Sequence, residues 1–213
     1  MARLNQFDRI DHLMIEVDDP QASYEDFYRK FALPQAWPLI TSDRYASIGM
    51  NFGNANIELI SFKERFGITN TEYSGLSGVC LTSQTDSENI RAGLNDESIE
   101  LLDGEDTQGY KTFVIAGKEV PTVFVCYYKF NTDGWKARLS EEYKKSNGGA
   151  FGIAKIEEVC INNPLLEKHE FKFDQSDSVK LRFSKTPEVR LKSTQNDFIG
   201  KSIVVGETLF SFC

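Results

Sequence analysis

The stretch Ile10-Asp11-His12-Leu13-Met14-Ile15-Glu16-Val17-Asp18-Asp19-Pro20 is typical of a strand that leads into a helix. Side chains alternate between the two faces of a strand. One face is therefore expected to carry only Leu13, Ile15 and Val17. The other face combines apolar and polar side chains, namely Ile10, His12, Met14 and Glu16. This pattern predicts a sheet that packs on a core behind and lines a cavity in front.

Composition places the chain among globular proteins. Its 213 residues are 40% hydrophobic and 26% charged, which is enough to form a proper core. No apolar run approaches the roughly 20 residues that span a bilayer, and the first residues lack the core of a signal peptide. The four cysteines lie far apart and form no CxxC pair. We therefore expect a cytoplasmic protein with free thiols and no membrane association.

The net charge of −8 is unevenly distributed along the chain. Residues 1–133 carry 11 Lys and Arg against 21 Asp and Glu, whereas residues 134–213 carry 13 against 11. The acidic balance argues against nucleic acid as a partner, because phosphate contacts need clustered basic residues. It suits a neutral or cationic ligand, although a solvated acidic surface is the commoner explanation.

The order of predicted elements repeats after the opening strand. Asp19 and Pro20 predict the start of a helix over 20–32, and strands are predicted over 36–41, 45–52 and 56–62. A linker, Lys63–Gly75, then precedes a second set of elements. That set comprises a strand over 78–83, a helix over 87–95 with a capping box at Thr85 and Glu88, and strands over 98–102, 111–116 and 122–130. The chain therefore contains two βαβββ units, 1–66 and 75–133.

The remaining residues, 147–213, follow a predicted helix over 134–146. Strands are predicted over 153–161, 170–173, 179–183, 188–191 and 202–205. The segment Ile153–Pro164 repeats the pattern of Ile10–Pro20, but no amphipathic helix follows it. We interpret this region as a partial, strand-rich third repeat that extends or covers the sheet, with the whole chain forming one compact structural domain.

Four segments resemble the vicinal oxygen chelate (VOC) superfamily, the glyoxalase-like proteins of the glyoxalase/bleomycin resistance/dioxygenase type. They are DHLMIEVDDP and FGNANIELISF in the first unit, SGLSGVCLTSQTDSENIRAGL in the second, and NGGAFGIAKIEEVCINNP, which is similar to a subgroup with a third partial repeat. The resemblance implies an α+β fold of bacterial type, in which repeated βαβββ units form a curved, mostly antiparallel sheet around a cavity.

The same resemblance implies a metal site and a lyase or isomerase activity. VOC proteins typically bind a divalent metal with a His on the first strand and a Glu on the fourth strand of each unit, and the matching residues here are His12 and Glu58. Both are candidate catalytic residues and ligands for Zn, Ni, Fe or Mn. The second unit departs from this pattern. It has Gly78 near the His position and offers Tyr127 and Lys129 but no carboxylate on its fourth strand.

His12 has three interpretations: a metal ligand, a general base oriented by a carboxylate, or a buried histidine with satisfied hydrogen bonds. The expected ligand pocket is walled by Met14, Glu16, Trp37, Met50, Phe52 and Tyr127, with Trp135 as a further candidate, although such residues are more often plain core. His169 lies among charged residues, which predicts a surface histidine.

Motifs for nucleotide cofactors and for serine or cysteine nucleophiles are missing from the sequence. The first hypothesis is a VOC-type enzyme, monomer or homodimer, that binds a small molecule with His12 and Glu58, with metal-assisted isomerase or lyase chemistry. The second is a metal-free binding protein of the drug-sequestering, resistance type, without turnover. A structural role with a filled cavity is the third.

Overall fold

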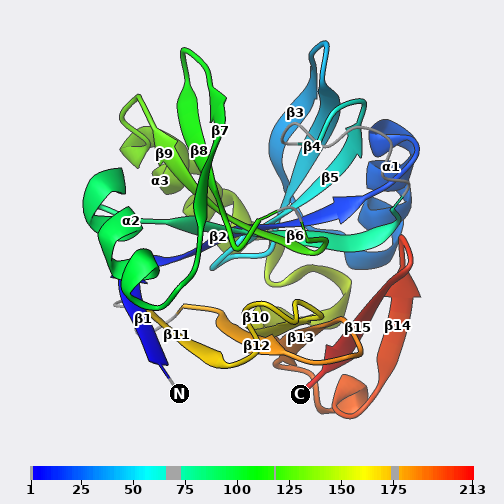
Figure 1. The fold of residues 1–213 in the computed structure, drawn as a ribbon. Coiled ribbons are helices and arrows are strands. Elements are labelled where there is room, and N and C mark those ends of the chain that lie inside the picture. The colour runs from blue at the N-terminus through cyan, green and yellow to red at the C-terminus, as the bar shows by residue number, and fades with distance from the viewer. Residues whose placement is uncertain (1, 66–72, 118, 174–177) are drawn as a thin grey trace.

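The structure is a computed structural model that describes residues 2–65, 73–117, 119–173 and 178–213. An eight-stranded sheet occupies the upper part of the molecule (Figure 1). Its strand order is β3-β4-β5-β2-β6-β9-β8-β7. The first half consists of β2 (Arg9–Glu16), α1 (Pro20–Phe31), β3 (Gln35–Thr41), β4 (Tyr45–Asn51) and β5 (Asn56–Phe62). The second half consists of β6 (Gly75–Thr82), α2 (Ser87–Asp96), β7 (Leu101–Asp106), β8 (Tyr110–Ile115) and β9 (Thr122–Tyr128).

The strand order is symmetric about the central pair of the sheet. β2 and β6 are antiparallel neighbours, and each also pairs in parallel with the last strand of its own half, β5 or β9. The predicted α+β class and its repeated βαβββ order are therefore confirmed. Residues 66–72 of the predicted linker lie outside the described residues.

Helices α1 and α2 begin where an aspartate side chain accepts hydrogen bonds from free backbone amides. The Asp19 carboxylate accepts from the amide of Ala22 at the start of α1. At α2 the capping residue is Asp86, whose carboxylate accepts from the amides of Glu88 and Asn89. The capping role predicted for Thr85 is therefore wrong by one residue, because the next side chain reaches two amides at once.

The C-terminal region forms a sheet of its own below the first (Figure 1). Its order is β12-β10-β13-β15-β14, from β10 (Ile153–Ile161), β12 (Lys180–Phe183), β13 (Glu188–Ser193), β14 (Ser202–Val205) and β15 (Thr208–Phe212). A separate parallel pair joins β1 (Ala2–Phe7) to β11 (His169–Phe173). Short 3₁₀ helices, Gly149–Phe151 and Asn196–Phe198, complete the region. It covers the first sheet rather than extending it, and β1 and β15 were not among the predicted strands.

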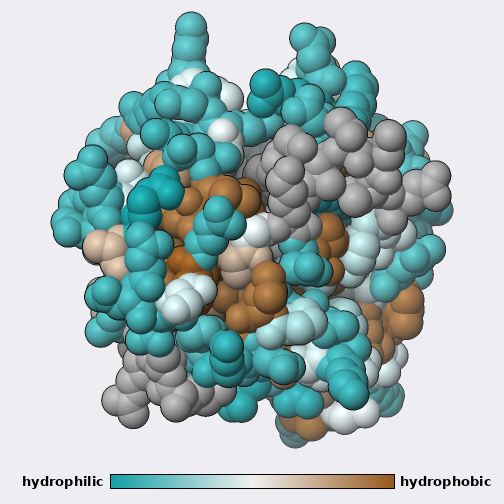
Figure 2. Space-filling model, viewed as in Figure 1, coloured by the Kyte–Doolittle hydropathy of each residue, from teal (hydrophilic) through white to brown (hydrophobic). Residues whose placement is uncertain are grey.

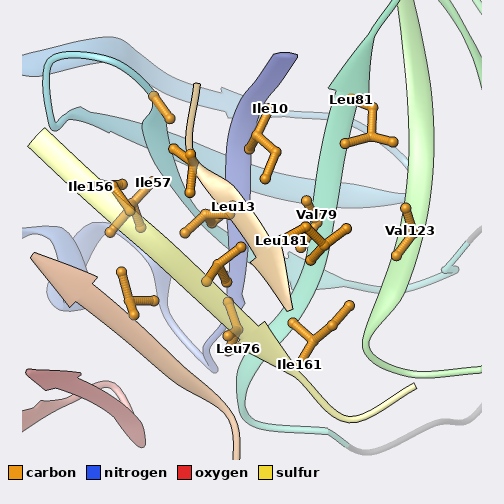
Figure 3. Close-up of a cluster of buried hydrophobic side chains, with 14 of the residues drawn as sticks. Ile10, Leu13, Ile57, Leu76, Val79, Leu81, Val123, Ile156, Ile161 and Leu181 are labelled. Atoms are coloured by element: carbon orange, nitrogen blue, oxygen red, sulfur yellow. The ribbon is translucent and has the colours of Figure 1, made fainter. Parts of the chain in front are cut away.

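The main core lies between the two sheets (Figure 3). Ile10, Leu13, Ile57, Leu76, Val79, Leu81 and Val123 from the eight-stranded sheet meet Ile156, Ile161 and Leu181 from the C-terminal sheet. Helix α1 adds Phe27 and Phe31, and the ring centroid of Phe31 lies 5.2 Å from that of Phe210 on β15. Burial of each large apolar side chain contributes about 1.5–3 kcal/mol, so the C-terminal sheet is an integral part of the fold.

One irregularity of β2 alters its predicted faces. The pairing of β2 with β6 shifts register between Ile10 and His12. Such a bulge disturbs the strict alternation of side chains. Ile10 consequently lies in the core with Leu13, and not on the cavity face with His12 as the sequence pattern predicts.

The surface view in Figure 2 shows apolar side chains gathered near the middle of one face and hydrophilic side chains around them. All four cysteines are free, and Cys80, Cys126 and Cys160 are buried. His169 is also buried, with a relative exposure of 4%, so the prediction of a surface histidine is wrong. It lies on β11, which packs beside β1. Within the described ranges no helix is long and apolar enough to cross a membrane.

Candidate functional site

The eight-stranded sheet and α3 (Asp133–Ser146) enclose a cavity of about 420 Å³. Both halves of the sheet contribute to it, from β2, β3, β4 and β5 on one side and from β7, β8 and β9 on the other. Eight aromatic side chains line it: Trp37, Tyr45, Phe62, Tyr110, Phe124, Tyr128, Phe130 and Trp135. Aromatic walls with a few polar groups are typical of small-molecule sites.

Cross-strand pairing places the side chains of the first half. On β4 and β5 the directly opposite pairs Ser47–Ile60 and Tyr45–Phe62 both line the cavity. Gly49 lies opposite Glu58 on the same face. A Cβ atom on Gly49 would be 2.3 Å from Cδ2 of Trp37. The glycine therefore provides the space in which the Trp37 indole lies over β4.

Two carboxylates flank the ring of His12. Nδ1 of His12 lies 3.1 Å from Oδ2 of Asp11, and Nε2 lies 3.4 Å from Oε2 of Glu58. Asp11 also accepts hydrogen bonds from the Tyr128 hydroxyl (2.8 Å) and from the Arg9 guanidinium (3.1 Å). Asp11 and His12 are both buried, so these charges face one another away from bulk water.

The electrostatics of this cluster favour a protonated imidazole. Burial by itself lowers the pKa of His12, but the hydrogen bonds to Asp11 and Glu58 and their negative charges raise it to about 10. Burial raises the pKa of Asp11, and its contacts with His12, Arg9 and Tyr128 outweigh that effect and lower it to about 2. His12 is therefore a cation at neutral pH, held between two anions. A free general base, one of the predicted roles, needs the neutral ring.

A second polar cluster lies on the opposite wall. The hydroxyl of Tyr110 donates to Oε2 of Glu105 at 2.7 Å, and the hydroxyls of Tyr45 and Tyr110 are 2.9 Å apart. Burial raises the pKa of Tyr110, and its hydrogen bonds with Tyr45 and Glu105 raise it further. The exposed Arg44 places its Nη1 atom 3.6 Å from Glu105.

Helix α3 closes one end of the cavity with Trp135. Its ring centroid lies 6.2 Å from that of Trp37 and 5.9 Å from that of Tyr128. Arg138 of the same helix donates to the carbonyl of Ala36 at 2.8 Å. The helix that follows the second unit thus completes a site that begins in the first.

Four of the candidate residues from the sequence lie together in this cavity. His12, Met14, Trp37 and Glu58 all line it, and so does the further candidate Trp135. Met14 on β2 is directly paired with Glu58 on β5. Because His12 lies two residues before Met14 on the same face of β2, its imidazole shares the cavity face with the Glu58 carboxylate.

Met50, Phe52 and Tyr127 lie outside the lining and correct the predicted pocket wall. Met50 pairs with Ile57 and therefore shares the core face, opposite to that of Glu58. Phe52 follows the end of β4 and packs on α1. Tyr127 lies on the face of β9 turned away from the cavity, and its hydroxyl donates to the carbonyl of Thr85 at 2.6 Å.

Glu16 is also absent from the lining. It lies near the end of β2 and forms an ion pair with the buried Arg65, whose guanidinium lies 4.6 Å from the ring centroid of Phe62. Burial lowers the pKa of Arg65 to about 10. The Glu16 carboxylate is thus used to neutralise an internal charge.

Sequence reasoning missed Asp11, Tyr128, Tyr110 and Glu105. Asp11 joins the site because of the bulge in β2, which alternation cannot reveal. Glu105 lies beyond the strand predicted over 98–102, but β7 continues to Asp106 and carries Glu105 into the wall. The sequence holds no signal for Tyr128, because β9 is apolar or aromatic on both faces, and only the structure places Val123, Val125 and Tyr127 on the core face.

The side chains of the cavity are a poor match for the divalent metal site that the family resemblance implies. His12 and Glu58 supply two donors, whereas protein sites usually supply three or four. The described part of the chain brings together no group of three His, Cys, Asp or Glu side chains in a metal-binding arrangement. The two His12 ring nitrogens already face carboxylates.

The second half of the sheet cannot supply the missing ligands. By register, Gly78 occupies the position of His12 and Phe124 that of Glu58. A Cβ atom on Gly78 would be 2.3 Å from Cε of Met14 and 2.9 Å from the carbonyl oxygen of Thr122. The space that a ligand would need is therefore filled by Met14 and backbone.

Comparison with known proteins supports the architecture. No protein-family model matches the chain, and no curated protein sequence is significantly similar to it. Among solved structures, a hypothetical protein from Staphylococcus aureus aligns with a TM-score of 0.60 and 13% identity, over 96% of this chain and 98% of that one. A homoprotocatechuate 2,3-dioxygenase from B. fuscum aligns with a TM-score of 0.61 and 9% identity, over 100% of this chain and 72% of that one.

A further extradiol ring-cleaving dioxygenase structure from B. fuscum has a TM-score of 0.59 and 9% identity, over 100% of this chain and 73% of that one. At such identities the likeness concerns the fold, and it includes the paired βαβββ units that the sequence predicts. The chain shares the fold of these ring-cleaving dioxygenases, in agreement with the α+β architecture that the resemblance to the vicinal oxygen chelate superfamily implies.

Proposed function

We propose that this protein binds a small molecule in the aromatic cavity and that binding needs no metal. The observation that carries the proposal is the cavity itself: about 420 Å³, lined by eight aromatic side chains. Its volume lies within the range of roughly 300–1,000 Å³ that is usual for ligand pockets. A third role, in which the interior is simply filled, is disfavoured by this open volume.

The polar groups support binding over turnover. The His12 imidazolium is neutralised by Asp11 and Glu58, and a ring that holds both its protons is a poor proton acceptor. Glu105 and Tyr110 form a second closed set of hydrogen bonds. Such networks orient a ligand and keep the empty cavity ordered.

A metal-assisted VOC lyase or isomerase is the second candidate, and one observation favours it. Nε2 of His12 and Oε2 of Glu58 are 3.4 Å apart on adjacent strands, at the positions that the family resemblance implies for metal ligands. If this candidate is right, Ni, Zn, Mn or Fe should raise the melting temperature of the protein. His12→Ala should abolish that increase.

Intrinsic fluorescence provides a direct test of binding, because both tryptophans of the chain line the cavity. We expect members of a library of small aromatic compounds to change the emission. A compound that binds should then be titrated by calorimetry against two rim variants. Ile40 lines the cavity and is 46% exposed, whereas its neighbour Leu39 is 42% exposed and lies outside the lining.

Ile40→Trp should obstruct the entrance and weaken binding by about tenfold, equivalent to about 1.4 kcal/mol. Leu39→Trp adds the same ring beside the entrance and should leave affinity unchanged. Equal effects of both variants, or no response of the tryptophans to any compound, would contradict binding in this cavity.

A further inference from the structure

We infer that the cavity selects ligands that donate hydrogen bonds and carry positive charge, namely a protonated amine on an apolar or aromatic body. The inference rests on the proposed function and adds the chemical class of the ligand. It follows from the directions of the hydrogen bonds around the cavity, which use the polar hydrogens of the histidine, tyrosine and tryptophan side chains of the wall and leave carboxylate and tyrosine oxygen atoms facing the interior.

On the β2 side, the donors of the wall are already engaged. The two ring nitrogens of His12 face Asp11 and Glu58, and the Tyr128 hydroxyl donates to Asp11. The carboxylate of Glu58 uses one oxygen toward His12. Glu58 also lines the cavity, so its carboxylate faces the interior. A carboxylate oxygen can only accept a hydrogen bond.

On the opposite wall the polarity of the hydrogen bonds is fixed by Glu105. Because the Tyr110 hydroxyl donates to this carboxylate, it must accept from the Tyr45 hydroxyl, 2.9 Å away. The oxygen of Tyr45 is then left with lone pairs and without a free proton. Both ends of the cavity therefore present acceptors.

The indole groups donate outward as well. Nε1 of Trp37 lies 3.5 Å from Oγ of Ser47, and Nε1 of Trp135 lies 3.4 Å from the carbonyl oxygen of Ala36. Their ring faces remain for the ligand, and the π-face of tryptophan attracts cations. Hydroxyls of Ser47 and Thr112 also line the cavity, and they can accept as well as donate.

The charges agree with this polarity. Among the described residues that line the cavity there is no lysine or arginine, and the cation His12 is held between two carboxylates. Glu58 and Glu105 both belong to the lining. The units that form most of it, residues 1–133, carry 21 Asp and Glu against 11 Lys and Arg. Arg9 beside Asp11 and the exposed Arg44 beside Glu105 both lie outside the lining. Inside the cavity a ligand therefore meets the two glutamates, which favour a cation.

Three probes with one body separate charge from shape: 4-tert-butylbenzylammonium, 4-tert-butylbenzyl alcohol and 4-tert-butylbenzoate. Affinity is measured by calorimetry and by tryptophan emission on the full chain. We expect the ammonium ion to bind about tenfold more tightly than the alcohol, since hydrogen bonds to charged groups are stronger than neutral ones. The carboxylate should bind most weakly of the three.

Carboxylate variants locate the effect. Glu58→Gln and Glu105→Gln keep the shape of the side chain and should each remove most of the preference for the ammonium ion. Asp103→Asn removes the same charge from an exposed position of β7 and should leave both affinities unchanged. Circular dichroism and melting temperature establish that each variant is folded.

The possible outcomes separate the two proposals. If the alcohol binds as tightly as the ammonium ion, or if the carboxylate binds most tightly, the inferred ligand class is wrong and small-molecule binding stands. The class is also wrong if the ammonium preference survives in both Gln variants. If none of the three probes binds, the inferred ligand class is wrong, and the response of the tryptophans to the compound library decides the proposed function separately.

Discussion

Removal of one carboxylate from the His12 cluster is the most direct test of its charge state. In the native protein the pKa of His12 is raised from 6.5 to about 10, because hydrogen bonds and charge from Asp11 and Glu58 outweigh the effect of burial. At about 1.4 kcal/mol for each pH unit, this difference corresponds to about 5 kcal/mol in favour of the charged ring. Asp11→Asn removes the negative charge beside Nδ1 and replaces one of the two carboxylate oxygens that contact His12, Arg9 and Tyr128 by an amide nitrogen, which cannot accept.

We expect the pKa of His12 to fall well below its native value in Asp11→Asn. The free energy of unfolding at neutral pH should decrease by about 3 kcal/mol, as for other buried ion pairs that lose one partner. For a chain of this size the melting temperature should fall by roughly 6–12 °C. Asp103→Asn, at an exposed position, is the matched control and should change neither quantity.

The pH dependence has a defined sign. A raised pKa means that the folded state binds the proton more tightly than the unfolded chain. The contribution of His12 is therefore fully present below pH 6.5 and is lost as the pH rises through about 10. Asp11 acts at the other limit: its contribution is present above pH 3.8 and is lost as the pH falls through about 2.

NMR titration of the imidazole signals measures the pKa of His12 directly, because the chain has only two histidines and their signals can be told apart. His12 should titrate far above the ordinary value, whereas burial lowers the pKa of His169. The two signals should therefore move in separate pH ranges. A His12 signal that titrates at or below pH 6.5 would refute the charged cluster, and with it the closed hydrogen-bond arrangement of the cavity wall.

Three further substitutions test other parts of the structure. Gly49→Ala places a Cβ atom against the Trp37 indole. We expect altered tryptophan emission, weaker ligand binding and a free energy of unfolding lower by about 1–3 kcal/mol. Unchanged emission together with unchanged affinity would disprove this contact. Glu16→Gln leaves Arg65 buried without its partner. Chemical denaturation should show a free energy of unfolding lower by about 3–5 kcal/mol, and the double variant Glu16→Leu, Arg65→Met should recover most of this loss. A loss below about 1 kcal/mol would argue against a buried ion pair. His169 is buried, and neither ring nitrogen has a hydrogen-bond partner in the described residues. Because its pKa is lowered, the stability that the neutral ring contributes is lost as the pH falls below 6.5. His169→Phe should therefore be more stable than the native chain in acid but not above neutral pH, and an equal stability difference at all pH values would contradict this.

The order of secondary-structure elements could be predicted because its signals are local. Asp19 and Pro20 mark the start of α1, and the apolar spacing of Phe27 and Phe31 marks its buried face. The same order of signals occurs twice, so the two βαβββ units and their VOC resemblance followed from the sequence. β1 and β15 carry weaker signals and depend on partners far along the chain, β11 and β13.

The pair of His12 and Glu58 was also predictable, because Ile57 and Leu59 show which face of β5 is apolar. The rest of the site was not. The residues of β9 are apolar or aromatic on both faces, so alternation gave no basis to prefer Tyr128 over Tyr127. The bulge that brings Asp11 to His12 depends on pairing with β6.

Sequence alone thus determined the repeated βαβββ order and one polar pair of this protein, since cap residues and hydrophobic periodicity act between near neighbours. Only the tertiary structure decided what the cavity is. Tyr45 and Tyr110 are 65 positions apart and share a hydrogen bond because the two halves of the sheet curl toward each other. Trp135 reaches Trp37 because α3 folds back over β3. The physical reason is that a cavity is defined by contacts between distant segments, and the direction of each hydrogen bond in its wall depends on the whole network.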